Sequence, residues 1–426
     1  MKTFVTRLAV AAFAVPLAAV PAAADPVSDF YKGRTITLMV SAGAGGGYDA
    51  YGRTVARHIG RHIPGNPTIV VQNRPGAGGL VMANYFYNVA AKDGSVFGAI
   101  HRNMPTDPLI GEKGNRIKYV ATKFNWLGST NSEVSICASR ADSPVKTFQE
   151  AIDKGIILGA ESNSDIEQFP IVMNNLIGTR FKIITGYPSG TAVNLALERG
   201  EVQGRCGWSW TSFKSQKLDW VKKGFAHVFV QIALRKHPDI PNVPLVMDYV
   251  KDPDAVQALK LVFSRQEFGR PYFAPPSLPA DRVAALRAAF WKTMKDPEFV
   301  KEIDKQKLEL NPMNGEDLQA LIAELYKSPP KVVQAAIRAT HPQTALARAK
   351  IQLVTHKGKI EEVQKGGRTI VFLHDGKKVK AGVSGSKTAV MVGGKKAKRS
   401  AIKVGMNCSV TYPGPGQPAT KIDCGG

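Results

Sequence analysis

Apolar positions along the chain alternate between two spacings from residue 35 onward. Residues 35–41 form a short apolar run typical of a strand, and Tyr51, Val55 and Ile59 then recur every four positions, as on a helix face. Strands are expected at 35–41, 68–72, 96–100, 156–160, 181–185, 202–206 and 226–232, and helices at 51–63, 81–89, 192–199, 280–295, 298–307 and 315–326. Strands that alternate with helices predict an α/β protein with largely parallel sheets covered on both faces.

The pattern changes after a linker-like stretch at 341–350. Apolar runs at 369–373 and 377–383 flank an Asp375-Gly376 turn, and further short runs lie at 389–392 and 407–412. Short strands joined by glycine turns predict a small all-β domain, a barrel or a sandwich, over 351–426.

The first 24 residues have the layout of a secretory signal peptide. Lys2 and Arg7 give a basic start, an apolar run covers 8–20, and three alanines precede Asp25. The run is shorter than the roughly 20 apolar residues that a membrane span needs. We therefore expect an exported, soluble periplasmic protein that is cleaved after about Ala24.

Composition and charge narrow the class further. The chain is 44% hydrophobic and 21% charged, which suits globular domains, and its net charge is +23. From residue 351 onward there are 14 Lys and Arg against 4 Asp and Glu, about four times the charge density of the preceding mature chain. A basic surface attracts anions such as anionic lipid. A solvated basic face that binds no partner is an equally open interpretation of this charge. Export argues against nucleic acid as a partner.

Two glycine-rich loops, each between an expected strand and an expected helix, are the main candidate site. Glycine lets the backbone approach a ligand closely, and the N–H groups at a helix N-terminus favour an anion. Loops at the carboxyl ends of parallel strands form the crevice in which open α/β sheets bind ligands. The candidates are Ser41, Ala42, Gly43, Ala44, Gly45, Gly46 and Tyr48 in the first loop, and Asn73, Gly76, Ala77, Gly78 and Gly79 in the second.

Two other interpretations of these loops stay open. A nucleotide site fits poorly, because Tyr48 stands where the third glycine of Gly-x-Gly-x-x-Gly belongs and no phosphate-binding Gly-x-x-x-x-Gly-Lys-Ser/Thr loop is present. The glycines can also simply form tight turns.

Several strings, taken in order, resemble one receptor family. They are the Asn-Arg-Pro-Gly-Ala-Gly-Gly string at 73–79, and the segments 91–94, 182–187, 197–202 and 270–276. Together they resemble the Bug, or TctC-type, substrate-binding receptors of tripartite tricarboxylate transporters, over about residues 25–326. The first loop departs from the commoner family pattern, since Ser41-Ala42 stands where many members have Pro-Phe.

The resemblance implies a type II periplasmic-binding-protein fold with two lobes joined by crossing strands. It places residues 25–128 and 251–345 in the first lobe and 129–250 in the second, with 351–426 as an extra domain. It also implies a ligand carboxylate held largely by the two glycine loops, without a cofactor or a bound metal.

Four cysteines in an exported chain permit two disulfides, and none of them has Cys-x-x-Cys spacing. Cys137 and Cys206 fall within the second lobe, and Cys408 and Cys424 within the C-terminal domain. We therefore predict the pairs Cys137–Cys206 and Cys408–Cys424.

Other candidate ligand contacts lie in the expected second lobe and at the return strand. Arginines form bidentate pairs with carboxylates and aromatic residues line pockets, although structural arginines and core packing are equally common. These candidates are Ser162, Asp165, Gly190, Thr191, Arg205, Trp208 and Arg270. Asp49 is expected at a helix start, and His101 is a lone histidine near the crevice.

The leading hypothesis is a monomeric binding protein that captures a small organic acid and delivers it to the membrane permease subunits of a tripartite transporter. A periplasmic sensor co-receptor is the second interpretation, and an exported hydrolase the third. The chain contains no Gly-x-Ser-x-Gly, His-Glu-x-x-His or Cys-x-x-Cys motif, so catalysis has little support.

Overall fold

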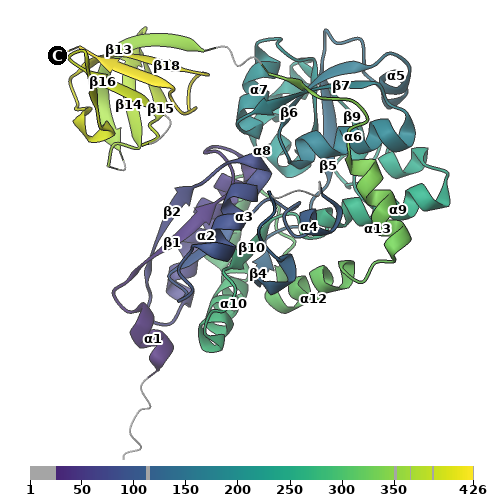
Figure 1. Ribbon diagram of the computed structural model, residues 1–426, viewed down its shortest axis with the longest axis horizontal. Helices are drawn as coiled ribbons and strands as arrows, with labels where there is room; N and C mark the ends of the chain where they lie inside the picture. The colour runs from purple at the N-terminus through teal and green to yellow at the C-terminus, as the bar shows by residue number, and fades with distance from the viewer. Residues whose placement is uncertain (1–24, 112–115, 350–352, 365, 386–387, 426) are drawn as a thin grey trace, which may run out of the picture.

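The computed structural model describes residues 25–111, 116–349, 353–364, 366–385 and 388–425 (Figure 1). The expected signal peptide lies outside the described residues. Two α/β lobes and a C-terminal β domain each surround a sheet of their own, which confirms the predicted fold class. Among the described residues, no helix is both long enough and apolar enough to cross a membrane.

The first lobe is built on a six-stranded sheet with the order β11-β4-β10-β3-β1-β2. Its strands are β1 (Thr35–Val40), β2 (Thr68–Asn73), β3 (Val96–Ala99), β4 (Asn125–Ser129), β10 (Pro271–Ala274) and β11 (Met313–Asn314). The helices are α1 (Pro26–Tyr31), α2 (Gly47–Ile59), α3 (Leu80–Asn88), α10 (Ala280–Met294), α11 (Pro297–Lys305) and α12 (Gly315–Leu325). The short helix α4 (Asp107–Ile110) follows β3 and buries Ile110 against the core of the second lobe. Tyr51, Val55 and Ile59 form the buried face of α2, as their spacing predicted.

The second lobe is built on a sheet with the order β12-β7-β6-β8-β5-β9. Its strands are β5 (Ser135–Arg140), β6 (Ile156–Glu161), β7 (Phe181–Tyr187), β8 (Gly204–Ser209), β9 (Ala226–Ile232) and β12 (Ala347–Arg348). The helices are α5 (Phe148–Asp153), α6 (Asp165–Ile177), α7 (Gly190–Glu198), α8 (Trp210–Lys222), α9 (Pro253–Phe263) and α13 (Pro330–Thr340). The predicted disulfide Cys137–Cys206 is present and joins β5 to β8.

The chain crosses between the lobes at 130–134, 264–270 and 326–329, and the first two crossings are hydrogen-bonded to each other. The Thr130 N–H donates to the Arg270 carbonyl at 3.2 Å, and the Glu133 N–H donates to the Gln266 carbonyl at 2.7 Å. Paired crossing segments of this kind are where two lobes hinge.

Two helices expected in the first lobe pack instead on the second. Apolar side chains of α9 and α13, including Leu259, Val262 and Ala336, are buried in one cluster with residues of α6 and its sheet. The linker-like stretch also contributes β12, which pairs in parallel with β7. Sequence spacing could not show this, because α9 ends just before the crossing at 264–270 and α13 begins just after the crossing at 326–329. We therefore propose that α9, α13 and β12 belong to the second lobe.

The C-terminal domain is a seven-stranded sheet with the order β15-β14-β13-β18-β19-β16-β17. Its strands are β13 (Val354–Gln364), β14 (Thr369–His374), β15 (Lys377–Gly382), β16 (Ala389–Val392), β17 (Lys395–Ala397), β18 (Asn407–Tyr412) and β19 (Lys421–Cys424). The backbone of Gly382 at the end of β15 bonds to Gln417 and Ala419, so the sheet curls back around its core. The predicted disulfide Cys408–Cys424 joins β18 to β19.

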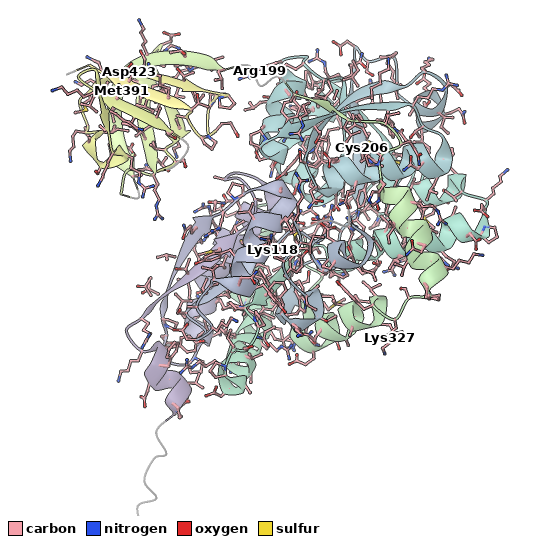
Figure 2. The ribbon with its side chains drawn as sticks, in the orientation of Figure 1. Lys118, Arg199, Cys206, Lys327, Met391 and Asp423 are labelled. Atoms are coloured by element: carbon pink, nitrogen blue, oxygen red, sulfur yellow. A yellow bond between two sulfur atoms is a disulfide. The ribbon has the colours of Figure 1, made fainter. Side chains whose placement is uncertain are left out.

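The C-terminal domain contacts the second lobe beside α7, near Arg199 (Figure 2). Arg199, which follows α7, donates a hydrogen bond to the Pro413 carbonyl at 2.7 Å. The first turn of the same helix lies at the cavity described below. Helix α7 therefore connects this domain to the space between the lobes.

Candidate functional site

A cavity of about 80 Å³ lies between the two lobes, at the carboxyl ends of β1, β3, β6, β7 and β8. Open α/β sheets bind ligands at this end of their strands. The lining residues are Ala42, Gly43, Gly46, Gly47, Tyr48, His101, Arg102, Glu161, Ser164, Asp165, Ile166, Ser189, Gly190, Thr191, Asn194, Arg205, Gly207, Trp208, Ser209, Ser212, Gln216 and Arg270.

The loop between β1 and α2 forms the first-lobe wall of the cavity. Asp49 near the start of α2 accepts hydrogen bonds from the Gly45 N–H at 2.9 Å and from the Asn73 side-chain amide at 2.7 Å. The loop passes close to the second lobe, because a Cβ on Gly43 would lie 3.1 Å from the Cβ of Ser189. Asp49 and Asn73 thus hold the loop in place, and glycine allows it to approach the opposite lobe.

The N-terminus of α7 forms part of the opposite wall. The Ser189 side chain caps this helix by accepting a hydrogen bond from the Ala192 N–H at 3.2 Å. Gly190 and Thr191 in the first turn line the cavity. The N–H groups of a helix start and its positive dipole end favour an anion at this position.

Arg270 lines the cavity, and its charge is paired with that of Glu133. Its guanidinium donates to the Glu133 carboxylate at 2.7 Å and to the hydroxyls of Ser209 and Ser212 at 2.7 and 2.8 Å. The guanidinium carbon also lies 4.5 Å from the ring centre of Tyr48. Arg270 therefore ties the crossing segment to the second lobe through Nε and Nη2, while no hydrogen bond from its Nη1 to a described residue is found.

Arg102 and Asp165 form an ion pair from one lobe to the other. Arg102 also donates to the Ser135 hydroxyl at 2.7 Å, and Asp165 accepts a second arginine bond from Arg265 at 3.0 Å. Burial raises the pKa of Asp165, but the charges of Arg102 and Arg265 outweigh burial and lower that pKa below its ordinary value. Asp165 is consequently ionised and holds the lobes together.

Arg205 has a different environment. It donates to the Gly190 carbonyl at 3.0 Å and to the side-chain oxygen of Asn194, and it lies 4.3 Å from the ring centre of Trp208. Within the described parts of the chain, no carboxylate forms an ion pair with it, although only 7% of its surface is exposed. A buried charge without a partner costs several kcal/mol of desolvation. An anion in the cavity would offset that cost.

Glu161 and His101 face each other across the cavity, with Oε2 and Nε2 3.9 Å apart. Burial raises the pKa of Glu161 to about 8, against the attraction of Arg205, and burial lowers the pKa of His101 to about 4. The Ser41 hydroxyl accepts from the His101 backbone N–H at 3.0 Å and shares a 2.7 Å hydrogen bond with Nδ1 of the same residue. At neutral pH, Glu161 is largely protonated and His101 is neutral.

The structure brings many of the predicted ligand-binding residues together at this cavity. Those that line it are Ala42, Gly43, Gly46, Tyr48, Asp165, Gly190, Thr191, Arg205, Trp208 and Arg270. Ser41, Ala44, Gly45, Asn73, Gly76, Ala77, Gly78, Gly79 and Ser162 lie outside the lining. Ser41 supports His101, for example, and Ser162 exchanges a 2.9 Å hydrogen bond with Thr185. Their roles as direct ligand contacts remain predictions.

The second glycine loop lies at the contact between the lobes. A Cβ on Gly78 would overlap the carbonyl oxygen of Asn163, and the Asn163 side chain donates to the Ala77 carbonyl at 3.3 Å. Gly78 also has a positive φ of 57°, which favours glycine. The loop thus lets the lobes approach each other closely.

Sequence reasoning missed several polar lining residues. Arg102 follows the expected strand 96–100 almost directly, and Glu161 follows the expected strand 156–160. A polar residue just after an apolar strand of a parallel sheet is the signal that could have found both. Ser189, Asn194, Ser209, Ser212 and Gln216 carry no comparable signal.

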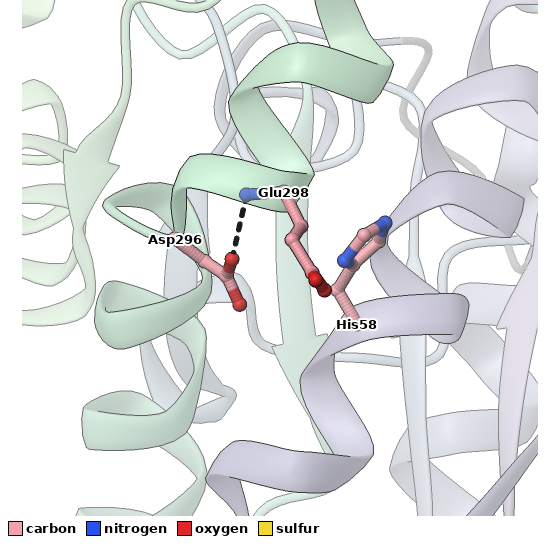
Figure 3. A group of neighbouring side chains, drawn as sticks. All are labelled: His58, Asp296 and Glu298. Carbon is pink, nitrogen blue, oxygen red and sulfur yellow. Dashed lines mark hydrogen bonds between the residues drawn. The ribbon is translucent and has the colours of Figure 1, made fainter.

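Among the residues that the structure describes, two clusters outside the cavity contain the residue types of a metal site. In the first, shown in Figure 3, the Asp296 carboxylate caps the Glu298 N–H at 2.9 Å. Arg61 already bonds to Asp296 at 2.5 Å and to Glu298 at 2.6 Å, while His58 bonds to Glu302 at 2.6 Å. In the second, Lys214 bonds to both Asp239 and Glu309. Because these carboxylates are paired with cations, neither cluster is assigned as a metal site.

Two lobes with a cavity between their strand ends define the two-lobed periplasmic-binding-protein fold. The structure is similar to that of the periplasmic binding protein BugD, with a TM-score of 0.59 and 20% identity over 74% of this chain and all of that one. It is also similar to MatC from Rhodopseudomonas palustris with bound malate, at a TM-score of 0.55 and 18% identity over 72% of this chain and 99% of that one. The structure of an R. palustris protein with adipate is similar too, at a TM-score of 0.56 and 16% identity over 71% of this chain and 97% of that one. These neighbours confirm the predicted resemblance at the level of the fold.

Sequence comparison adds one relative. A Cupriavidus necator protein described as "UPF0065 protein in gbd 5'region" is 33% identical over 161 residues, or 35% of this chain. The chain spans less than half of that relative's length, 44%. No family model matches the chain.

Proposed function

We propose that the protein is a periplasmic solute-binding receptor that captures a small organic carboxylate for a tripartite tricarboxylate-type secondary transporter. The observation that carries this proposal is the buried guanidinium of Arg205, which forms no ion pair with any described residue and lines a cavity beside the start of α7. The carboxylates named with two solved structures of this fold, malate and adipate, support the same class of ligand.

The proposal includes a cycle of lobe movement. Ligand binds between the lobes, and hinge closure at the crossing segments surrounds it. The exported monomer then presents the closed form to the permease subunits in the membrane. This role needs no cofactor and no catalysis.

We also propose that the C-terminal domain contacts an anionic surface of the cell envelope. Many of its lysines are exposed, and they lie on strands and turns around the domain. These lysines are Lys357, Lys359, Lys377, Lys378, Lys380, Lys395, Lys396, Lys398, Lys403 and Lys421.

The test is a binding screen on the mature protein from residue 25. Acetate, propionate, lactate, malonate, succinate, adipate and citrate are titrated by calorimetry, and the melting temperature is measured with each. Saturable binding of at least one acid, with an unchanged acid recovered by NMR, supports the receptor. Turnover of the acid would indicate an enzyme instead, and no binding by any carboxylate would reject the proposal.

A further inference from the structure

Glu161 is a buried carboxyl group at the cavity without a charged cationic partner. Only 4% of its surface is exposed, and it ends β6 at the space between the lobes. Among the described residues, the only basic side chain within ion-pair distance of its carboxylate is that of His101, whose Nε2 lies 3.9 Å from Oε2. His101 is neutral, because burial lowers its pKa to about 4. A buried carboxyl group that no cation pairs with takes up a proton, since its charged form is costly to desolvate.

The groups that pack around Glu161 act on its proton in both directions. Burial is the largest effect and raises the pKa of Glu161 to about 8. Arg205 on β8 and the N–H of Gly190 at the start of α7 favour the ionised form, whereas Glu167 on α6 favours the protonated form. Glu161 is therefore a group that changes its charge close to neutral pH.

The other charged or ionisable groups near Glu161 keep their state in this pH range. Burial lowers the pKa of Arg102 and of Arg270, but their acidic neighbours outweigh burial and raise both above the ordinary value. Asp165 at the start of α6 stays ionised, because the arginines beside it lower its pKa against the effect of burial. Tyr187, which lies beside Glu161 on β7, stays neutral, since burial raises its pKa to about 12.

Arg205 is the cation that an anion in the cavity and an ionised Glu161 would share. Both side chains line the same cavity of about 80 Å³, and no described carboxylate forms an ion pair with Arg205. A space this small places a bound anion close to both groups. Two negative charges that lie close together in a buried site disfavour each other. An anion and a protonated Glu161 are compatible, whereas an anion and an ionised Glu161 repel each other.

We propose that the cavity takes up a carboxylate anion together with one proton, and that Glu161 holds this proton. Arg205 then supplies the positive charge opposite the anion, and the neutral carboxyl group of Glu161 leaves that charge uncompensated until the anion binds. Wherever Glu161 is ionised beforehand, binding removes one anion and one proton from solution. This inference rests on the proposed carboxylate receptor and adds that its affinity depends on pH.

The pH dependence has a defined direction. The protonated fraction of a group with a pKa of about 8 falls about tenfold between pH 7 and pH 9. The affinity for the anion should fall by the same factor, about tenfold, over this range. The acids of the carboxylate screen are ionised throughout it, so their own titration does not contribute.

The first test is calorimetric titration of the mature protein with each acid of that screen, from acetate to citrate, at pH 7, 8 and 9. At pH 8 the titration is repeated in phosphate and in Tris, which release a proton with different heats. Every acid that binds should show the tenfold loss of affinity, and the heat at pH 8 should differ between the two buffers by the amount for about half a proton. One affinity at all three pH values, with the same heat in both buffers, would overturn the inference.

Glu161→Gln supplies the decisive variant, because glutamine has the shape of the protonated acid and cannot ionise. It should keep the affinity of pH 7 up to pH 9 and should show no buffer-dependent heat. Glu324→Gln, at an exposed carboxylate paired with Lys327, is the matched control and should behave like the wild type. If Glu161→Gln does not fold, the buffer-dependent heat of the wild type still decides whether a proton is taken up.

Arg205 is the other group whose titration would weaken binding in this range, because burial lowers its pKa to about 9. The two sources differ in the variant. A loss of affinity between pH 7 and pH 9 that persists in Glu161→Gln belongs to Arg205 and would overturn the role of Glu161.

A second test needs no ligand. A raised carboxyl pKa contributes stability below the ordinary value of 4.5 that is lost as the pH rises toward 8. Glu161→Gln should therefore melt at a higher temperature than the wild type, by a margin that grows between about pH 5 and pH 8. Infrared difference spectra of the two proteins at pH 6 should contain the band of a protonated carboxyl group, and this band should be lost at pH 9. A constant margin and no such band would show that Glu161 holds no proton, and the inference would fail.

The outcomes also separate this inference from the proposed function. If acids bind without pH dependence, the receptor remains and the coupling to a proton fails. If no carboxylate binds at any pH, both proposals fail, whatever the titration of Glu161.

Discussion

Gly78 of the first lobe lies against the backbone of Asn163 in the second lobe, where an added Cβ would overlap the Asn163 carbonyl oxygen. Gly78 does not line the cavity. A side chain at this position would therefore act on closure of the lobes and leave the cavity walls unchanged.

Gly78→Val is expected to leave both lobes folded and to weaken carboxylate binding about tenfold or more, because overpacking at a tight contact costs about 1–3 kcal/mol. Calorimetry measures the affinity, and small-angle scattering compares the dimensions of the protein with and without ligand. Gly33→Val is the matched control, since Gly33 has a similar positive φ of 69° but no atom within 4 Å of an added Cβ. Wild-type affinity in Gly78→Val would show that this contact does not govern closure.

Gly46→Val is expected to abolish carboxylate binding in a folded protein. Gly46 lines the cavity, and a Cβ there would lie 3.7 Å from the Thr191 hydroxyl of the opposite wall. The further methyl groups of valine would occupy the space of the ligand. Calorimetry with the best-binding acid measures the loss, and a wild-type affinity would remove the first glycine loop from the site.

Glu309→Gln is expected to destabilise the closed protein most at neutral pH. Glu309 of the first lobe accepts bonds from Thr211 at 2.7 Å and Lys214 at 2.6 Å, and lies 3.3 Å from His237, all three in the second lobe. Burial raises the pKa of Glu309, but the bonds from His237, Lys214 and Thr211 outweigh burial and hold it at about 2.

A lowered carboxyl pKa contributes stability that is present above the ordinary value of 4.5 and is lost as the pH falls toward 2. The difference in melting temperature between wild type and Glu309→Gln should therefore be largest above about pH 5 and shrink below it. Glu316→Gln, at an exposed carboxylate 3.4 Å from Arg287, is the control and should show little difference at any pH. A difference that does not depend on pH would contradict the role given to Glu309.

The two disulfides should stabilise different parts of the chain. Cys137–Cys206 spans 69 residues within the second lobe, and Cys408–Cys424 spans 16 within the C-terminal domain. Replacing each pair by serines should cost about 3–5 kcal/mol of unfolding free energy in the part that contains it. Only the first replacement should lower the melting temperature of the ligand-binding lobes. Peptide mapping without reductant checks the pairing, and free thiols or mixed pairs would refute it.

Removal of the C-terminal domain should leave ligand capture intact. A chain ending at residue 349 keeps β12, its pairing with β7 and every residue that lines the cavity. Its affinity for a bound carboxylate should equal that of the full mature chain. A chain ending at residue 345 also loses β12 and should melt at a lower temperature. Loss of binding in the longer truncation would mean that the domain acts on the cavity through α7.

Binding of the full mature protein to anionic vesicles should weaken as salt rises, because exposed charges are screened within about 8 Å at physiological ionic strength. Changing Lys377, Lys378 and Lys380 together to glutamate should reduce vesicle sedimentation markedly. The same change at the exposed first-lobe residues Lys301, Lys305 and Lys307 alters the net charge equally and should have little effect. Equal loss in both triple variants would show that net charge, and not the C-terminal surface, governs binding.

The sequence by itself determined the local elements and the class of the fold. The four-residue spacing of Tyr51, Val55 and Ile59 requires a helix with one buried face, and that helix is α2. The Asp375-Gly376 turn predicted a hairpin, and both residues have positive φ between β14 and β15. Such patterns are readable because a turn and a helix face depend on residues that are close in the sequence.

Only the tertiary structure decided which residues meet at the cavity and which form the lobe contact. Arg102 and Asp165 are 63 positions apart in the chain, and Gly78 meets Asn163 across the cleft. The second glycine loop has the same local pattern as the first, yet it lies outside the cavity. The sequence equally left open that Arg270 is neutralised while Arg205 is not, because this depends on where Glu133 and Asp165 lie in space. Contacts between distant segments follow from how the two lobes close on each other, which no local spacing encodes.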